Sequence, residues 1–146
     1  MSQHIRHDSR VQNLNYSEGW KHLTEKERNY AYWMAKASWA GAKVVLHQIS
    51  QESAPLFCIF QTYFRGKNFS ELEKHALQAG ASKEDWREFL AYAAGFYANL
   101  SNYHAFGHMK FVPNMEPDTF LAILKSCPKR NDDALSCQSL VQDIYP

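Results

Sequence analysis

The chain has 146 residues, of which 45% are apolar and 14% aromatic, and it carries 16 basic and 15 acidic side chains. A chain of this length can bury roughly two-thirds of the surface that its unfolded form exposes, so one core can form without disulfides or metal ions. The formal net charge of +1 provides no clustered positive field, which argues against nucleic acid or an anionic membrane as a partner.

The N-terminus has no apolar signal-peptide core, and no stretch approaches the roughly 18 apolar residues of a membrane span. The three cysteines form no CxxC pair, and their odd number cannot be paired completely within the chain. We therefore expect a cytoplasmic protein with reduced thiols, in which a polar leader (residues 1–15) precedes one helical domain (residues 16–146).

Apolar residues in the domain recur at helical spacing, and no window alternates as a half-buried strand does. Thr24 and Glu27 form a capping-box pattern that opens a long helix, ending at about Ser50. A second, very apolar helix is expected between about Ser53 and Gly66. Spacings of three and four residues in the first helix predict one buried apolar face, made of Tyr30, Trp33, Met34, Ala37, Gly41, Val44 and Val45.

A capping-box pattern at residues 70–73 predicts a short helix closed by Gly80, and Ser82 with Asp85 opens a fourth helix that reaches about Tyr103. The core stripe of this fourth helix comprises Trp86, Phe89, Leu90, Ala93, Phe96, Tyr97, Leu100 and Tyr103. Small residues form a second row on each long helix, namely Ala91, Gly95, Ala98 and Asn102, and Ala31, Ala35, Ser38 and Ala42. Such rows let helix axes approach, so we expect the two long helices to pack closely; helix propensity is the alternative explanation.

Residues 104–116, interrupted by Gly107 and Pro113, predict an irregular loop. Two shorter helices follow, at about 117–126 and 133–145. The last helix carries an apolar stripe to its end, made of Cys137, Leu140, Val141, Ile144 and Tyr145. Because such a stripe needs a covering surface, we expect an exposed apolar patch or self-association there. The predicted fold is all-α, with about six helices.

The sequence contains few motifs that are typical of catalytic or metal-binding sites. His104 and His108 are four residues apart, but Gly107 lies between them and no third ligand is near, so loop imidazoles are the simpler interpretation. His7 is interpreted as a surface imidazole of the leader. The chain has no Gly-rich phosphate loop, no GxSxG elbow and no His-Glu dipeptide. We therefore assign it no catalytic residue, no metal ligand and no cofactor.

Two blocks of the sequence resemble one enzyme family. Residues 102–113 read Asn-Tyr-His-Ala-Phe-Gly-His-Met-Lys-Phe-Val-Pro, which is similar to the pattern Asn-Tyr-x-Ser-Phe-Gly-Asp-x-Lys-Phe-x-Pro near the N-terminus of dipeptidyl peptidase III. Residues 25–41, which include Arg-Asn-Tyr-Ala-Tyr-Trp, resemble the first long helix of that family. The order and spacing of the similar residues match those of the family over residues 20–124.

Members of that family are cytosolic zinc exopeptidases that remove dipeptides from the N-termini of short peptides. Their zinc ligands come from a His-Glu-x-x-x-His helix and a second, Glu-rich motif, and this chain contains neither. The resemblance therefore implies a non-catalytic N-terminal portion of the lower lobe. Hydrolysis needs a metal that activates water, so zinc is expected only in a full-length enzyme and this chain alone is expected to be inactive.

In the family the Ser-Phe-Gly loop lines the peptide cleft. The resemblance implies Phe106 as an apolar wall, Ala105 where a hydrogen-bonding Ser is usual, and Asn102 as a further substrate-binding residue; His108 replaces the usual Asp. The implied partners are short peptides and a missing C-terminal lobe, or a second copy of the chain. The alternative function is a stand-alone helical module that binds a peptide or protein through its aromatic surface and has no peptidase activity.

Overall fold

The computed structural model describes residues 3–10, 12–105, 109–126 and 134–145. It is predominantly helical, as predicted. The helices are α1 (Ser17–Lys21), α2 (Glu25–Ile49), α3 (Ser53–Phe64), α4 (Phe69–Gln78), α5 (Lys83–Asn99), α6 (Pro117–Lys125) and α7 (Ala134–Ile144). Two short strands, β1 (Gln3–Ile5) and β2 (Phe111–Pro113), pair in parallel. None of the described helices is long and apolar enough to cross a bilayer.

Two helices begin with the capping boxes that the sequence predicts. At α2 the Thr24 hydroxyl accepts a hydrogen bond from the Glu27 amide at 3.3 Å, and the Glu27 carboxylate accepts one from the Thr24 amide at 2.8 Å. Ser82 and Asp85 make the same reciprocal pair of bonds at the start of α5. Each box satisfies two amides that have no partner inside the helix, which explains why these boundaries were predictable.

Gly66 and Gly80 follow α3 and α4 in the left-handed conformation, with φ of +65° and +98°, as expected for glycines that end helices. The start of α4 differs from the prediction. Its N-terminal cap is Asn68, whose side chain accepts a hydrogen bond from the Ser70 amide at 2.9 Å. The predicted box at residues 70–73 is therefore wrong, because an asparagine two residues earlier already caps the helix.

Helix α5 is the centre of the core. Trp86, Phe89, Ala93 and Phe96 of the predicted stripe are buried, which confirms much of it, although α5 ends at Asn99 rather than near Tyr103. Tyr92, which the predicted stripe does not include, is also fully buried. Phe60 of α3 is also fully buried. Its ring centroid lies 5.5–6.2 Å from those of Phe64, Phe89, Tyr92, Phe96 and Tyr97.

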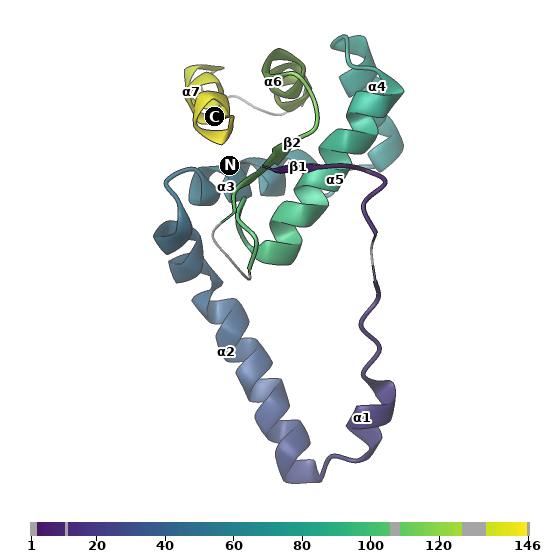
Figure 1. Cartoon of the computed structure of the whole chain (residues 1–146), viewed down its shortest axis with the longest axis vertical. Coiled ribbons are helices and arrows are strands. Elements are labelled where there is room, and N and C mark those ends of the chain that lie inside the picture. The colour runs from purple at the N-terminus through teal and green to yellow at the C-terminus, as the bar shows by residue number, and fades with distance from the viewer. Residues whose placement is uncertain (1–2, 11, 106–108, 127–133, 146) are drawn as a thin grey trace.

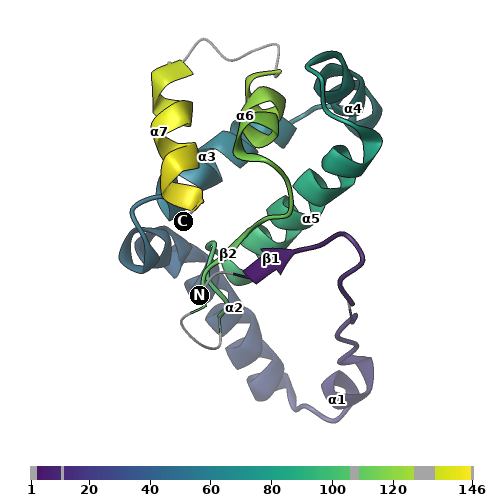
Figure 2. The ribbon, with the colours of Figure 1, turned by 45° about the horizontal axis from the view of Figure 1, so that its top comes forward.

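The apolar stripe of α7 is covered, so the predicted exposed patch at this end of the chain is wrong. Cys137, Leu140, Val141 and Ile144 are all buried. Helix α6 lies beside α7 and packs against it (Figure 2). The stripe predicts an apolar face correctly, but spacing within one helix does not reveal what covers that face.

The predicted close packing of the two long helices is also wrong. Helix α2 projects away from the other helices (Figure 1) and packs on α3 through its C-terminal part, where Ala42 and Leu46 are buried. The face predicted to be buried is largely exposed, with exposed fractions of 69% for Tyr30 and 64% for Trp33. An apolar face needs a partner surface, and among the described elements α3 is the one that packs extensively on α2, at its C-terminal part, while the N-terminal half is hydrogen-bonded to α1 through Arg28 and the Lys21 carbonyl.

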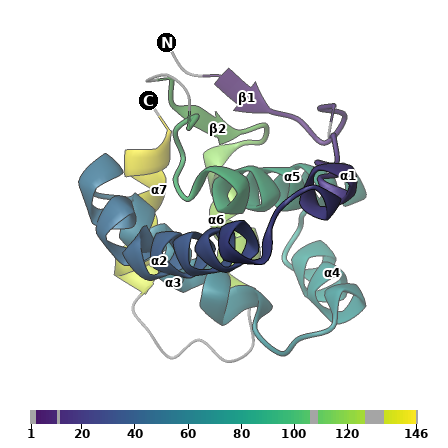
Figure 3. The ribbon, with the colours of Figure 1, turned by 90° about the horizontal axis from the view of Figure 1, so that it is seen from below.

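The small residues of α5 instead receive the N-terminal strand. A Cβ atom at Gly95 would lie 2.5 Å from Cδ1 of Ile5, so glycine is what allows this approach. Figure 3 shows β1 and β2 side by side over α5, in agreement with their contacts. The polar leader and the 104–116 loop, which was predicted to be irregular, thus contribute one strand each. Strands of three residues are too short to show alternation in the sequence.

Candidate functional site

A loop between α5 and β2 is closed at its base by backbone contacts. An isolated antiparallel bridge joins Tyr103 to Lys110, and the His104 amide donates to the carbonyl of Met109 at 3.1 Å. The two arms of the loop are therefore held together. We call residues 103–110 the base-closed loop; they include most of the segment on which the family resemblance rests.

A buried polar network lies directly under the loop. Asn102 is fully buried, and its Nδ2 donates to Oε1 of Glu52 at 3.0 Å. Its Oδ1 accepts from the hydroxyls of Ser50 and Ser53 at 3.2 and 3.3 Å. The carbonyl of Asn102 accepts from the Phe111 amide at 2.9 Å, which ties the second arm of the loop to the end of the first. One asparagine thus joins the α2–α3 junction to both arms.

Glu52 and Lys110 complete the network. Nζ of Lys110 lies 2.8 Å from Oε1 of Glu52, which is 7% exposed, and it also donates to the carbonyl of Asp143 in α7. Burial by itself would raise the pKa of Glu52, but hydrogen bonds from Asn102 and Lys110 outweigh it and hold the pKa below its usual value. The carboxylate is therefore charged at neutral pH, and it pairs with a lysine from the loop.

The predicted substrate-binding residues Ala105 and Asn102 differ in their exposure to solvent. Ala105 is exposed on the loop, and its amide donates to Oδ1 of Asn99 at 2.9 Å. Asn102 lies in the network beneath the loop and has no exposed surface. Phe106 and His108 lie outside the described residues, so the location of the Phe106 ring stays a prediction.

Three motif residues at the end of the loop and in β2 have structural roles. Lys110 makes the ion pair with Glu52, whereas Phe111 and Pro113 form buried ends of β2. Sequence reasoning missed Glu52, since nothing in the spacing of residues 50–53 relates them to a motif about fifty residues later. Ser50 and Ser53 resembled ordinary residues of a helix boundary.

One group of three potential metal ligands occurs among the described residues. His7, Glu84 and Glu88 each offer one ligand atom, and these atoms all lie within 4.8 Å of one another. Nδ1 of His7 is already 2.6 Å from Glu88 and 3.2 Å from Glu84, which are hydrogen-bond and ion-pair distances. The group has one imidazole, and its members satisfy one another, so we assign it no metal.

Comparison with known proteins identifies the family of this segment. The chain is 37% identical over 136 residues to Dipeptidyl peptidase 3 of Nematostella vectensis, a match covering 90% of this chain. It is 40% identical over 108 residues, or 74% of the chain, to Dipeptidyl peptidase 3 of Homo sapiens. The corresponding protein of Dictyostelium discoideum is 37% identical over 126 residues, or 86% of the chain. The chain belongs to the dipeptidyl peptidase III family.

Family membership confirms the resemblance drawn from residues 25–41 and 102–113. No family model matches the chain. The chain spans only 15–19% of the length of these dipeptidyl peptidase 3 relatives. Most of each relative therefore has no counterpart here, and its activity cannot be assigned to these residues by name alone.

Proposed function

We propose that the chain corresponds to the N-terminal, non-catalytic portion of a cytoplasmic, zinc-dependent dipeptidyl peptidase III and forms part of its peptide-binding cleft. The observation that carries this proposal is the base-closed loop, which rests on the buried Asn102 and Glu52. Binding residues are commonly placed on loops that a rigid scaffold positions. The proposed ligand is the N-terminal part of a short peptide.

The proposal gives the predicted site residues distinct roles. Phe106 supplies an apolar wall, and the exposed Ala105 lies where the peptide backbone would pass. Asn102 acts indirectly, because its side chain is bonded to Glu52 and to two serines. The direct contact between Asn102 and substrate stays a prediction. Zinc does not fit the described residues of this chain, so the metal that activates water belongs to the remainder of the enzyme.

A chimera tests the proposal. Residues of this chain would replace the matched segment of the human relative, and we expect the purified chimera to bind zinc and release dipeptides from a chromogenic dipeptidyl substrate. The matched control carries a Gly-Ser linker in place of residues 104–109 and should lose substrate affinity while keeping its zinc. A folded, zinc-loaded chimera whose KM is unaffected by the linker would contradict a role for the loop in the cleft.

The isolated chain is expected to show no dipeptidyl peptidase turnover and to purify without stoichiometric zinc. The reason is that it lacks the His-Glu and Glu-Glu pairs of the family's zinc motifs, and peptide hydrolysis of this type needs a metal-activated water. Elemental analysis and release of a chromogenic product measure the two properties. One tightly held zinc per chain, or turnover above that of a heat-inactivated sample, would show this prediction to be wrong.

A second candidate function, a stand-alone interaction module, is favoured by one observation, the exposed aromatic side chains distributed around α2. Tyr30, Trp33 and Trp39 are 69%, 64% and 70% exposed. The ring centroids of Tyr32 and Trp33 lie 5.3 Å apart. Extended apolar surfaces mark interaction sites, and aromatic residues are enriched in the centres of interfaces. The partner would be a peptide, another protein or a second copy of this chain.

Self-association through α2 is expected for the isolated chain. Trp33→Glu combined with Trp39→Glu should shift the chain to monomer in sedimentation velocity with little change in melting temperature, because both side chains are already exposed. Lys26→Gln together with Lys43→Gln is the matched control, since it lowers the net charge of the same helix by the same amount without removing aromatic surface. A wild-type chain that stays monomeric at high concentration would argue against self-association.

A further inference from the structure

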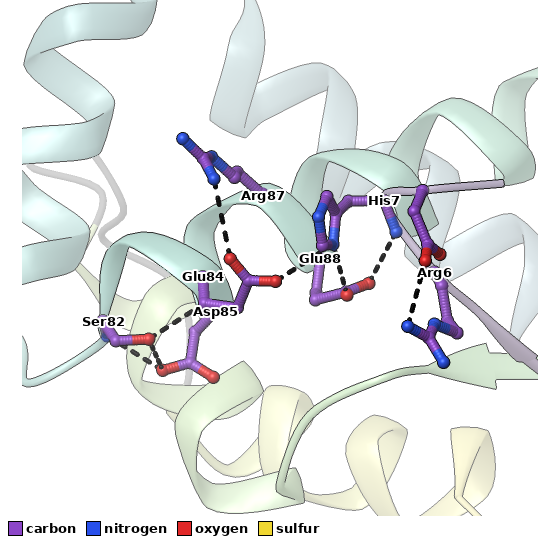
Figure 4. A network of polar contacts seen from close by, with 8 residues as sticks. Arg6, His7, Ser82, Glu84, Asp85, Arg87 and Glu88 are labelled. Carbon is purple, nitrogen blue, oxygen red and sulfur yellow. Dashed lines mark hydrogen bonds and ion pairs between the residues drawn. The ribbon is translucent and has the colours of Figure 1, made fainter.

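The N-terminal strand is fastened to α5 by one histidine (Figure 4). The backbone amide of His7 donates to Oε2 of Glu88 at 2.8 Å, and Nδ1 of His7 lies 2.6 Å from Oε1 of the same carboxylate. Glu88 is 4% exposed. Both oxygens of its carboxylate contact His7, which lies 81 positions earlier in the chain. Hydrogen bonds to a charged, buried carboxylate are among the stronger polar contacts in proteins.

The same strand lies against the second arm of the base-closed loop. The Gln3 amide donates to the carbonyl of Lys110 at 3.0 Å, and Nδ1 of His4 lies 3.1 Å from the carbonyl of Pro113. Because the Phe111 amide donates to Asn102, β2 is held on one side by the polar network and on the other by β1. The N-terminal strand is thus one of the supports for this arm, beside the polar network and the packing of β2 on α5.

Strand pairing by itself provides little support. A pair of three-residue strands is marginal in water, and terminal segments fray unless another contact ties them down. The contact of Ile5 with Gly95 adds some apolar burial. His7, two residues beyond the strand, makes two short hydrogen-bond contacts with the buried Glu88 carboxylate. These are the contacts of this segment that a charged, buried group strengthens.

We propose that His7 is a positioning residue for the base-closed loop: by binding Glu88 it holds β1 on β2, and β1 in turn fixes residues 110–113, where the loop ends and continues into β2. Only the contacts described above are needed for His7 to hold residues 110–113 in place. The consequence for peptide binding rests on the proposed function.

The charges around His7 favour its protonated form. The hydrogen bond with Glu88 is the main cause that raises the pKa of His7, and the carboxylates of Glu84 and Asp8 add to it. Arg6 pairs with Asp8 and Arg87 faces Glu84 at 3.7 Å, so both arginines reduce the negative field only in part.

Glu88 has the opposite shift. Burial alone would raise its pKa, but hydrogen bonds from His7 and Asn114 outweigh this and lower it. A raised histidine pKa means that the charged pair stabilises the strand fully below the unfolded pKa of about 6.5 and loses this effect as pH rises through the folded-state value. The tie is therefore strongest at weakly acidic pH, where Glu88 is charged and His7 is protonated.

Hydrogen exchange in the intact 146-residue chain tests the inference. At pH 6.5, His7→Ala should speed exchange in segments 3–5 and 110–113 by about tenfold or more. Arg6→Ala is the matched control, because Arg6 is the adjacent residue and forms its ion pair with the exposed Asp8, and it should leave both segments as in the wild type. The ratio of exchange rates between His7→Ala and the wild type should fall toward one as pH rises through the raised folded-state pKa of His7.

Two outcomes would overturn the inference. Unchanged exchange in both segments would mean that His7 does not fasten the strand, and faster exchange confined to residues 3–5 would mean that the strand does not position the loop. In a chimera extended at its N-terminus to include residues 3–19 of this chain, His7→Ala should raise KM severalfold with kcat nearly unchanged. Loosened segments with an unchanged KM would support the positioning role and contradict the proposed function of the loop, so the two failures are distinguishable.

Discussion

Glu52→Ala is expected to lower the free energy of unfolding by about 3 kcal/mol. The substitution leaves Nδ2 of Asn102 without its acceptor in the interior and removes the carboxylate that pairs with Lys110. Removing one partner of a buried pair costs about 3–5 kcal/mol, and we take the lower end because the Lys110 side chain is 21% exposed. At this chain length the loss corresponds to a fall in melting temperature of about 6–12 °C.

Glu18→Ala is the matched control for that measurement. Glu18 also pairs with a lysine, Lys21, at 2.7 Å, but the two side chains are 81% and 66% exposed, so the expected change is under about 0.5 kcal/mol. Equal melting temperatures for the two variants would show that the buried network contributes nothing special to folding.

The effect of Glu52→Ala should also depend on pH. Because the folded-state pKa of Glu52 is lowered, its stabilising contribution is present above the unfolded value of about 4.3 and is lost as pH falls through the folded value. Thermal denaturation at pH 7 and at about pH 3 measures this, and the difference between variant and wild type should shrink at the lower pH.

Phe106→Ala in the chimera is expected to weaken peptide binding by about tenfold to a hundredfold. An aromatic side chain that becomes buried against a ligand contributes roughly 1–3 kcal/mol, which converts to that range of affinity. Zinc content and melting temperature should change little if the ring serves the cleft and not the core. Competition of an unlabelled peptide with a fluorescent one gives the affinity directly.

Met109→Ala is the matched control for Phe106→Ala, since Met109 is on the same loop and is 41% exposed. It should leave peptide affinity within about twofold of the parent chimera. A Phe106→Ala chimera that melts early while its folded fraction binds peptide normally would place the ring in the core and end the binding hypothesis.

Much of the helical framework was predictable from the sequence because its signals are local. The capping boxes at Thr24 and Ser82 satisfy amides within one turn, and Gly66 and Gly80 end helices through their own backbone freedom. The motif at residues 102–113 is also a local signal, and it is enough to indicate the family. The site was predictable only as a loop, since the motif does not say what supports it.

By itself the sequence determined the helices α2 to α7, their apolar faces and the family to which the chain belongs, whereas it gave no signal for the short α1. The tertiary structure decided which faces are covered and which distant residues meet. Helix α7 is covered by α6 whereas the aromatic face of α2 is exposed, although both stripes have the same spacing. Asn102 meets Glu52 across 50 residues and His7 meets Glu88 across 81. The physical reason is that capping and periodicity act within a few residues of the chain, whereas burial and charge pairing depend on how separate elements pack.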